Sequence, residues 1–454
     1  MSDLIKKYNV PVPRYTSYPP ANFFHAHFSE EDLRKAIALS NTQEPRHLSF
    51  YIHIPFCVTM CHYCGCNSYP MQRDADVRAY IDALLHEIEL MCANIDQKRK
   101  IAQIHYGGGT PTAIPGTYIQ MINERLLSKF DCIEEPEIAI ECHPGNMDEN
   151  DFLFLIDAGF NRMSIGIQDF NQEVLKAVNR IPPKIPVETI VNILKEKNIR
   201  INFDFIYGLP LQSIESFTET IQKAVELSPD RIVTFSYAHV PHLFKRQTLL
   251  EKKSLPKEML KKNLYETGRR LLLAGDYRQV GIDHFVKKTD ELHRAVQEGT
   301  LHRNFQGYCT RRTTGQVYAF GVTAISQLAS AYAQNTKDID EYIATVHKNR
   351  IPVKKGYALN AEEQITRAAI IELMCNEQLD WTALSERLHT PVSEIKVATA
   401  YSEKKIQQFA DDGLLTFEEN KLIMSEKGSP FVRNVAASLD KLMKHNDKKF
   451  SKPI

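Results

Sequence analysis

Short apolar runs alternate with longer amphipathic segments along the first half of the chain. The short runs are rich in β-branched and aromatic residues, and most are apolar without interruption, which is typical of strands buried on both faces of a sheet. The predicted strands span 47–54, 101–106, 136–142, 162–168, 199–206 and 230–238. Apolar residues at helical spacing predict helices between them, at 74–94, 117–129, 149–158, 171–178, 186–197 and 213–227.

The alternation of strand and helix predicts parallel βαβ units, and therefore an α/β barrel or a doubly wound sheet. In α/β barrels the active site lies at the C-terminal ends of the strands. Polar or glycine-rich stretches follow the predicted strands at this end, at 57–66, 107–112, 141–145, 168–170 and 207–210. We therefore expect these loops to meet at one cleft.

The pattern changes near residue 360. Predicted helices at 362–376, 381–388 and 393–412 precede a hairpin-like stretch at 413–428 and a last helix near 428–444. This order is typical of a small winged-helix domain, a class that often binds DNA. The charge of this segment is balanced, however, and its basic run, KHNDKKFSKP, resembles a solvated tail. We expect a lid over bound substrate and no nucleic-acid partner.

The composition narrows the class of protein. A chain of 454 residues that is 43% hydrophobic can bury a large core, and its length predicts one large domain with a smaller one. Lys and Arg number 56, as do Asp and Glu, so no overall field attracts nucleic acid or an anionic membrane. No run approaches the roughly eighteen apolar residues of a membrane span, and MSDLIKKYNV lacks the apolar core of a signal peptide. We expect a cytoplasmic monomer without membrane insertion.

Four of the nine cysteines lie within YIHIPFCVTMCHYCGC, residues 51–66. The odd number, with the other five scattered along the chain, argues against a disulfide framework. Structural zinc sites usually join two close pairs across a dozen or more residues, whereas this C-x3-C-x2-C-x-C pattern has no second pair. One loop can instead wrap three thiolates, at Cys57, Cys61 and Cys64, around a [4Fe-4S] cluster and leave one iron without a protein ligand.

Two points about this loop stay open at the level of sequence. A structural zinc site remains the alternative, because spacing alone does not fix which three cysteines are ligands. Cys66 follows Cys64 with a single residue between them, so its side chain is expected to point elsewhere.

The GGGTPT stretch at 107–112 suits a ligand-binding loop, since glycines expose backbone N–H and C=O groups, although alone it fits an ordinary tight turn. It is not a phosphate-binding P-loop, because no Gly-Lys-Ser/Thr follows.

The C-x3-C-x2-C motif, with the aromatic Tyr63 before its third cysteine, resembles that of the radical S-adenosylmethionine (SAM) enzymes. The resemblance implies that the amine and carboxylate of SAM bind the open iron, and that one electron from the cluster releases a 5'-deoxyadenosyl radical. The cofactor then supplies the difficult chemistry, while the protein positions the C–H bond and excludes water.

A longer series of motifs resembles the oxygen-independent coproporphyrinogen III oxidase family over nearly the whole chain. The motifs are KYNVPVPRYTSYPP, FYIHIPFC, HYGGGTPT, NRMSIGIQDFN, VNR, DFIYGLP, YAHVP, LHRNFQGY and FGVTAIS. The resemblance implies an α/β fold, a partial (β/α)6 radical SAM barrel with an N-terminal arm and a winged-helix-like C-terminal domain. The expected divisions are the arm with a helix at 1–45, the barrel with its cluster loop at 46–280, a connecting and substrate-contacting segment at 281–359, and the helical domain at 360–454.

The resemblance also implies a reaction. Two propionate side chains of coproporphyrinogen III become vinyl groups, giving protoporphyrinogen IX in heme biosynthesis. The family binds two SAM molecules and needs a low-potential electron donor and an electron acceptor, which the sequence does not identify.

Site residues follow from the resemblance position by position. The implied cluster ligands are Cys57, Cys61 and Cys64, and the implied catalytic residues are Tyr51, Glu141, Phe305 and Gln306. The residues implied to hold the cluster-bound SAM are Tyr51, Gly108, Glu141 and Ile325. Those implied to hold the second SAM are Tyr63, Gly109, Thr110, Gln168, Arg180, Asp204 and Ala238. A guanidinium such as Arg180 can hold a carboxylate, and a carboxylate such as Asp204 can meet an ammonium or hydroxyl group. Alternatively, Tyr51 and Ile325 are plain barrel packing, and Asp204 pairs with an arginine at the strand end. The LHRNFQGYCTRR segment adds Arg303, Arg311 and Arg312, which suit a tetrapyrrole bearing carboxylates or form a solvated basic loop.

Two other functions fit the cysteine motif, and the sequence differs from the family pattern at two positions. The main alternative is the heme chaperone of the same superfamily, which binds and delivers heme, and a second is the heme-degrading methyltransferase; the N-terminal arm and HRNFQGY argue against both. Tyr63 stands where the family has phenylalanine, and in ECHP a histidine, His143, stands where an acidic residue precedes the proline. Cys142 and His143 reflect either local packing or contacts with SAM, and the sequence leaves both open.

Overall fold

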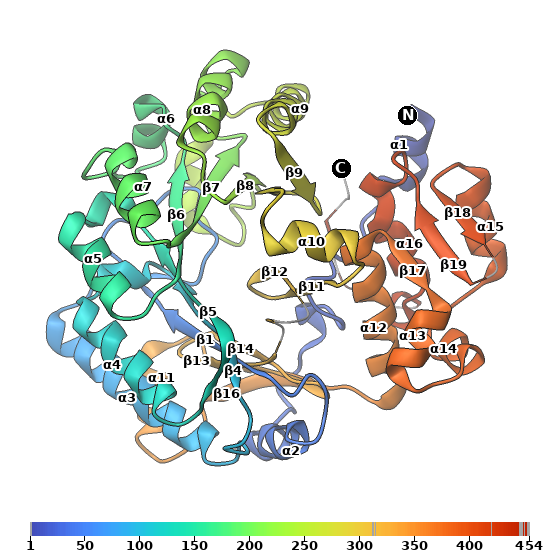
Figure 1. Ribbon diagram of the computed structural model, residues 1–454, viewed down its shortest axis with the longest axis horizontal. Coiled ribbons are helices and arrows are strands. Elements are labelled where there is room, and N and C mark those ends of the chain that lie inside the picture. Colours follow the sequence, from blue (N-terminus) through green and yellow to red (C-terminus); the bar gives the residue numbers. More distant parts are fainter. Residues whose placement is uncertain are drawn as a thin grey trace.

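The computed structural model describes residues 2–310, 313, 315–418, 420–444, 448 and 450–451. Figure 1 shows a larger α/β unit beside a smaller, mostly helical unit formed by the C-terminal residues. Each unit has its own hydrophobic core, and the larger core gathers apolar side chains from both the strands and the surrounding helices. The expected α/β fold with a separate C-terminal helical domain is confirmed.

The six predicted strands form the parallel centre of one sheet. They are β1 (Leu48–Ile54), β4 (Ile101–Gly108), β5 (Cys132–Cys142), β6 (Arg162–Gln168), β7 (Arg200–Tyr207) and β8 (Arg231–Ser236), and each pairs in parallel with the next. The helices between them form an outer ring (Figure 1): α3 (Asp74–Cys92), α4 (Gly116–Leu127), α5 (Glu149–Asp157), α6 (Gln172–Ala177), α7 (Val187–Glu196) and α8 (Ile214–Leu227). The strands and helices predicted for this half are confirmed, and the result is a partial barrel.

The sheet continues beyond the predicted strands to twelve in all, in the order β16-β15-β14-β13-β1-β4-β5-β6-β7-β8-β10-β9. On one side β13 (Gln316–Phe320) pairs in parallel with β1, followed by the antiparallel β14 (Ile325–Gln327), β15 (Ala331–Asn335) and β16 (Val353–Ala358). On the other side lie β9 (Tyr277–Val280) and β10 (His284–Lys287). The segment expected to connect the domains thus contributes much of one sheet edge.

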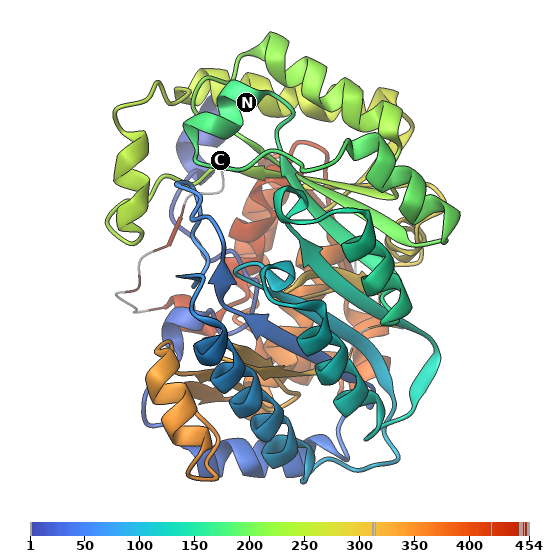
Figure 2. The same cartoon turned by 90° about the vertical axis from the view of Figure 1, so that its left-hand side faces the viewer.

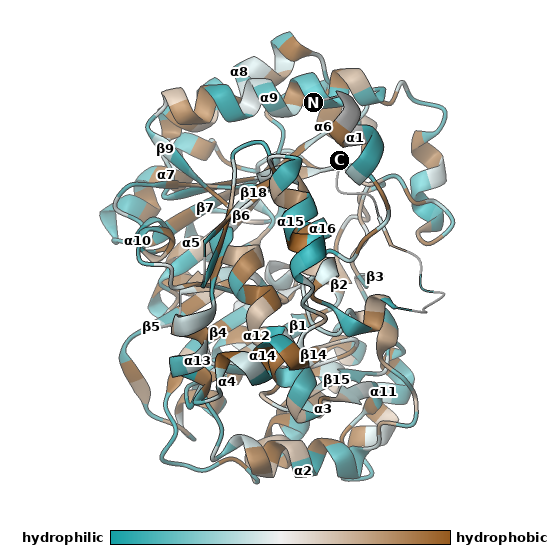
Figure 3. Cartoon of the chain, turned by 90° about the vertical axis from the view of Figure 1, so that its right-hand side faces the viewer, coloured by the Kyte–Doolittle hydropathy of each residue, from teal (hydrophilic) through white to brown (hydrophobic). Residues whose placement is uncertain are grey.

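The remaining elements of the larger unit surround this sheet. They are η1 (Ala21–Phe23), α2 (Glu30–Ser40), β2 (Phe56–Cys57), β3 (Tyr69–Pro70), η2 (Pro111–Ala113), η3 (Pro144–Asn146), η4 (Lys245–Leu250), α9 (Glu258–Ala274), α10 (Glu291–Gln297), the hairpin of β11 (Leu301–Asn304) with β12 (Gly307–Thr310), and α11 (Ile339–Val346). Figure 2 shows the helical layer stacked along the curved strands. The helices carry both polar and apolar stripes (Figure 3), and no helix in the described chain is long and apolar enough to cross a membrane.

The C-terminal unit combines helices with a small sheet. It contains α12 (Ala361–Asn376), β17 (Gln378–Asp380), α13 (Trp381–Leu388), α14 (Val392–Ala398), α15 (Glu403–Asp411), β18 (Leu415–Glu418), β19 (Lys421–Met424), η5 (Ser429–Phe431), α16 (Val432–Ser438) and η6 (Lys441–Met443). The predicted hairpin is β18 and β19, and β17 adds a third strand to it.

Two helix predictions in this unit are wrong. The helix predicted at 393–412 is two helices, because the backbone is extended at Thr399 and at Ser402. The carbonyl of Ile395 accepts both the backbone N–H and the side-chain hydroxyl of Thr399, so this residue caps α14 where the helix ends. The helix predicted near 428–444 is confined to α16, flanked by short 3-10 turns.

The N-terminal arm joins the two units. Its first helix, α1 (Ser2–Tyr8), lies beside the C-terminal unit (Figure 1), and Tyr8, Tyr15 and Tyr18 belong to the core of that unit. Further along, His25 and Gly356 exchange backbone hydrogen bonds of 3.0 and 3.1 Å at the edge of the large sheet. The arm therefore spans from the small core to the barrel edge.

Candidate active site

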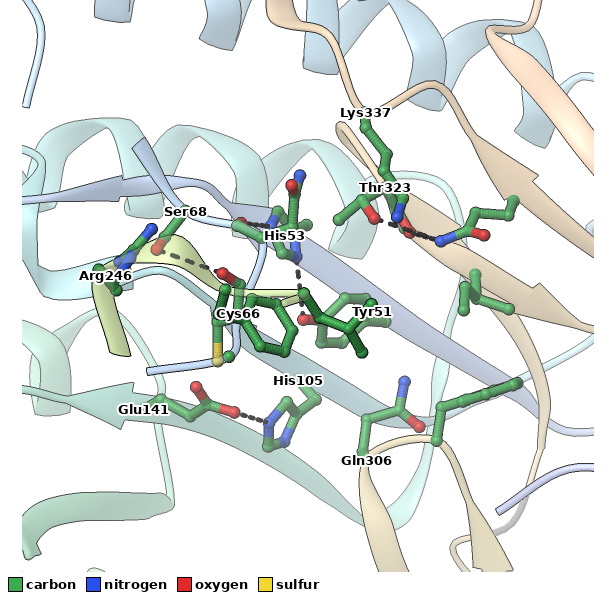
Figure 4. Close-up of a pocket in the computed structure, with 18 of the residues that line it drawn as sticks. Tyr51, His53, Cys66, Ser68, His105, Glu141, Arg246, Gln306, Thr323 and Lys337 are labelled. Carbon is green, nitrogen blue, oxygen red and sulfur yellow. Dashed lines mark hydrogen bonds and ion pairs between the residues drawn. The ribbon is translucent and has the colours of Figure 1, made fainter. Parts of the chain in front are cut away.

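Two adjoining cavities lie at the C-terminal ends of the barrel strands. The larger has a volume of about 870 Å³, and Figure 4 shows the side chains that line it. The smaller has a volume of about 160 Å³ and lies against the cysteine loop. Four residues line both cavities: Cys66, Ser68, Glu141 and Arg246. Four of the five expected stretches, at 57–66, 107–112, 141–145 and 168–170, therefore contribute to one place, whereas residues 207–210 line neither cavity.

The structure brings nearly all of the predicted site residues to these cavities. The smaller is lined by Cys57, Cys61, Tyr63, Cys64, Gly108, Gly109, Thr110, Glu141, Gln168, Arg180 and Asp204. The larger is lined by Tyr51, Glu141, Phe305, Gln306 and Ile325. Of the residues predicted for the cluster, the two SAM sites and the catalytic group, all of which the structure describes, Ala238 alone lines neither cavity; it is exposed just beyond β8. Arg303, suggested for the substrate, also lines neither cavity.

The cysteine loop begins where β1 ends, and its thiols differ in exposure. Cys57 and Cys61 are buried, Cys64 is half-buried and Cys66 is exposed. Each of the first three sulfurs accepts a hydrogen bond: Cys57 from the Thr110 hydroxyl at 3.4 Å, Cys61 from the Arg180 guanidinium at 3.6 Å, and Cys64 from the backbone N–H of Cys66 at 3.4 Å.

Donors aimed at sulfur favour the thiolate, which is the form that binds metal. At Cys64 the hydrogen bonds from Cys66, with the nearby charges of Arg246 and Arg180, outweigh burial and lower the pKa of the thiol to about 6. The described thiols line a cavity wall, and among the described residues no three His, Cys, Asp or Glu side chains converge on one point as they would around a single metal ion.

The glycine loop leaves no room for side chains beside the cavities. Gly108 has φ +118°, and a Cβ there would lie 2.7 Å from the His53 ring. A Cβ at Gly107 would lie 2.7 Å from a carboxylate oxygen of Glu141 and 3.1 Å from the Tyr51 ring. Glycine at these positions therefore allows β1, β4 and β5 to present their polar side chains together.

A chain of interacting side chains crosses these strands at the floor of the large cavity (Figure 4). The His53 ring donates from Nε2 to the carbonyl of Asn67 at 3.0 Å, so its Nδ1 accepts from the Tyr51 hydroxyl at 3.2 Å. The Tyr51 ring stacks on His105, whose Nε2 lies 3.3 Å from a carboxylate oxygen of Glu141. Burial lowers the pKa of His53 to about 4, so this histidine is neutral near pH 7.

The small cavity contains a carboxylate and an unsatisfied amide. Asp204 accepts hydrogen bonds from the Ser164 hydroxyl at 2.6 Å and the Asn202 amide at 3.0 Å, so its strand-end partners are neutral side chains and not the arginine considered from the sequence. Burial raises the pKa of Asp204. Gln168 has φ +69°, a strained value for a residue other than glycine, and its Oε1 is buried with no hydrogen-bond partner in the described part of the chain.

Several residues of the large cavity escaped the sequence analysis. Lys245 and Arg246 follow β8, and Lys337 follows β15, so positive charge reaches the cavity from loops far apart in sequence. The basic pair within HLFKR was the available signal. Phe305 packs edge to face on Tyr332 at the tip of the β11–β12 hairpin, with 5.9 Å between the ring centroids. Arg311 and Arg312 lie outside the described residues.

Comparisons with known proteins agree with this architecture. Residues 51–224 match the radical SAM superfamily, and residues 359–431 match the HemN C-terminal domain. Oxygen-independent coproporphyrinogen III oxidases from Synechocystis sp. and Helicobacter pylori are both 36% identical to this chain; the alignments cover 100% and 99% of this chain and 98% of each relative.

A solved structure is also similar over its full length. It is the coproporphyrinogen III oxidase (HemN) from Escherichia coli, described as a radical SAM enzyme, with a TM-score of 0.87 and 34% identity, and the match covers 97% of this chain and 99% of that chain. Identity of this level over nearly all of both aligned sequences, together with two cavities built around the cysteine and glycine loops, assigns the chain to the oxygen-independent coproporphyrinogen III oxidase family of radical SAM enzymes.

Proposed function

We propose that the protein converts two propionate side chains of coproporphyrinogen III to vinyl groups, giving protoporphyrinogen IX in heme biosynthesis in the cytoplasm. The observation that carries this proposal is the cavity of about 870 Å³ that shares Glu141 and Cys66 with the cysteine-lined cavity. Its volume falls within the range of about 300–1,000 Å³ typical of small-molecule sites. A substrate there lies directly beside the site of radical formation.

The three cysteine thiols at the small cavity fit a [4Fe-4S] cluster, which membership of the family implies together with SAM. Cys57, Cys61 and Cys64 would hold the cluster, since all three line the small cavity and each sulfur accepts a hydrogen bond. When bound, the cluster and SAM supply the 5'-deoxyadenosyl radical that removes a hydrogen atom from the propionate β-carbon. The thiols are spread along the cavity wall, and this arrangement suits a cluster of several atoms better than a single zinc ion.

The protein's own contribution is to bind and orient two SAM molecules. Tyr51, Gly108, Glu141 and Ile325 would hold the SAM on the cluster, while Tyr63, Gly109, Thr110, Gln168, Arg180 and Asp204 would hold the second. Glu141 offers a carboxylate for sugar hydroxyls or an ammonium group, and Arg180 offers a guanidinium for a carboxylate. The role of Ala238 in the second site rests on the family resemblance alone.

Substrate recognition falls to the opposite side of the large cavity. Phe305 offers a ring face or edge to the tetrapyrrole, and Gln306 has a buried Oε1 with no partner in the described chain. Lys245, Arg246 and Lys337 bring cationic side chains to bind propionate carboxylates.

Electron balance requires partners outside the chain. For each propionate, one hydrogen atom would pass to the 5'-deoxyadenosyl radical, giving 5'-deoxyadenosine, while carbon dioxide and one further electron leave as the alkene forms. A low-potential donor must supply the electron that cleaves SAM, and an acceptor must take the electron from the substrate. The expectations of a monomer and of no nucleic-acid partner stay predictions.

The test is an anaerobic assay of the protein with a reconstituted cluster. Coproporphyrinogen III, SAM, a strong reductant and an electron acceptor from cell extract are added, and vinyl product and 5'-deoxyadenosine are measured together. We expect one 5'-deoxyadenosine for each vinyl group that forms, and neither product with the Cys64→Ser variant. Deoxyadenosine without decarboxylation would show that the substrate is wrong, and heme binding without either product would favour the heme chaperone.

A further inference from the structure

His143 lies in the wall of the small cavity, on the loop that follows β5. The residue is 5% exposed, and its ring has one hydrogen-bond partner in the described chain. That partner is the backbone N–H of Gly145, which lies 3.1 Å from Nδ1.

This single contact fixes the position of the ring proton. A backbone N–H can only donate, so Nδ1 of His143 is an acceptor, and the neutral ring must carry its proton on Nε2. The ring is neutral because burial and the positive charge of Arg180 lower the pKa of His143 to about 3. Nε2–H is therefore a buried donor without an acceptor among the described residues.

A buried donor of this kind needs an acceptor, and the cavity indicates which chemistry supplies it. The charge of Arg180 lowers the pKa of His143, whereas the charge of Glu141 helps burial to raise the pKa of Asp204. The lining thus contains groups that attract anions, Arg180 and His143, and groups that attract cations, Glu141 and Asp204. An α-amino acid group, with its carboxylate and its ammonium, matches this division.

We propose that His143 binds the carboxylate of the SAM molecule in the small cavity, donating a hydrogen bond from Nε2. The proposal rests on the proposed function, because it takes the second SAM as the occupant of that cavity. His143 therefore has two separate tasks: Nδ1 holds the turn at Gly145, and Nε2 serves the ligand. The ring adds a donor where a carboxylate side chain could accept from Gly145 but could donate nothing.

Two substitutions separate the tasks. His143→Asn keeps an acceptor near the position of Nδ1 for the turn, and removes the distant donor. His143→Gln places an amide N–H near the position of Nε2, and removes the acceptor for Gly145. His347→Asn is the matched control, because His347 is an exposed histidine at the end of α11.

The experiment measures binding rather than turnover. Protein with an oxidised, reconstituted cluster is dialysed against labelled SAM without reductant, so SAM is not cleaved, and the number of sites and their affinities are determined. For the wild type and His347→Asn we expect two sites. For His143→Asn we expect the second site to weaken at least about tenfold, as befits the loss of a hydrogen bond to a charged group, and the first to be unchanged. His143→Gln should recover part of the loss.

Decarboxylated SAM as a competitor tests which group His143 contacts. It should bind the second site of the wild type more weakly than SAM does, and this preference should shrink in His143→Asn to the part that the Arg180 guanidinium supplies. Two sites of wild-type affinity in His143→Asn would overturn the proposal and leave the oxidase function intact. A single site in the wild type would overturn both the second SAM and the role of His143, while vinyl formation by the same preparation tests the oxidase function independently.

Discussion

A buried cluster of charges at the end of the barrel opposite the cavities gives a sharp test of what stabilises the fold. Glu137 on β5 is 9% exposed and accepts hydrogen bonds from the Arg162 Nε at 2.7 Å and the Gln103 amide at 2.8 Å. Arg162 begins β6 and is 4% exposed, and its two terminal nitrogens have no hydrogen-bond partner in the described chain. Glu137 is therefore the group that chiefly compensates the buried charge of Arg162, and Glu291, whose carboxylate lies 3.8 Å from Arg162 Nη2, adds a weaker ion pair.

The size of the effect follows from the titration of Glu137. Burial opposes ionisation, but the charges of Arg162 and Arg231 outweigh it and lower the pKa of this carboxyl group from 4.5 to about 2. At about 1.4 kcal/mol for each pKa unit, the ionised form contributes about 3 kcal/mol to the free energy of unfolding. Breaking a buried ion pair by removing one partner costs about 3–5 kcal/mol in other proteins, which agrees.

We expect Glu137→Gln to destabilise the protein by about 3 kcal/mol at neutral pH. The folded-state pKa is lowered, so the contribution is complete above pH 4.5 and is lost as the pH falls toward 2. The difference between wild type and variant should therefore be constant from about pH 6 to 8 and shrink below pH 4.5.

The assay is chemical unfolding followed by far-ultraviolet circular dichroism, which reports the whole chain. Fluorescence of Trp381, buried in the C-terminal core, follows the smaller unit separately. Glu188→Gln is the control, since Glu188 pairs at 3.0 Å with Lys223 on the surface, where such pairs contribute at most about 1 kcal/mol. A loss for Glu137→Gln no larger than that of the control, or one that persists unchanged below pH 4, would refute the reasoning.

Three further predictions follow from the site and the arm. Cys66→Ser should retain the iron and sulfide of the reconstituted protein, because Cys66 is exposed and contacts Cys64 through hydrogen bonds, of which the backbone N–H stays in the variant and the serine hydroxyl can replace the thiol donor; loss of iron would make it a ligand. Gly107→Ala should weaken SAM binding at least about tenfold in a dialysis assay with little change in circular dichroism, because the new methyl group would lie 2.7 Å from a carboxylate oxygen of Glu141; wild-type affinity would contradict this. Asp440, which accepts from the Tyr15 hydroxyl at 2.9 Å, has its pKa raised by burial from 3.8 to about 6, so folding favours its protonated form and stability falls as the pH rises from 3.8 through 6. Limited proteolysis should therefore cut the arm faster at pH 7.5 than at 5.5, and Asp440→Asn should remove this difference.

The sequence was most informative where the pattern repeats. The six parallel strands follow from continuous apolar runs between amphipathic helices, and the carboxyl ends of parallel strands necessarily lie at one edge. The strands at 316–358 were missed because their pattern is interrupted by buried polar residues. Gln316 begins β13 fully buried, yet its amide is satisfied by carbonyls of Ser40, Gln43 and Pro45, which no local pattern can show.

The candidate site, like the fold, has some features that short stretches of sequence indicate and others that only the three-dimensional structure shows. The cysteine and glycine loops carry their chemistry in short stretches of sequence, so the cysteine spacing pointed to a metal cluster and the two loops together, through their family resemblance, indicated SAM. Arg246 and Lys337 reach the large cavity from loops about ninety residues apart, and only the three-dimensional fold places them together. The Asn202 and Ser164 partners of Asp204 likewise come from two neighbouring strands, in a register that the sequence does not specify.

Unsatisfied polar atoms at the cavities connect stability with function. The buried Gln168 Oε1, Gln306 Oε1 and His143 Nε2 have no partner among the described residues, and all three residues line a cavity. Each such atom costs about 1–3 kcal/mol when it stays unpaired, so the free protein forgoes stability at the place where ligands bind. A ligand recovers this free energy only if it brings a donor to each glutamine and an acceptor to the histidine. An apolar molecule of the same shape recovers none of it, so the same atoms that weaken the empty site also select a polar, charged ligand.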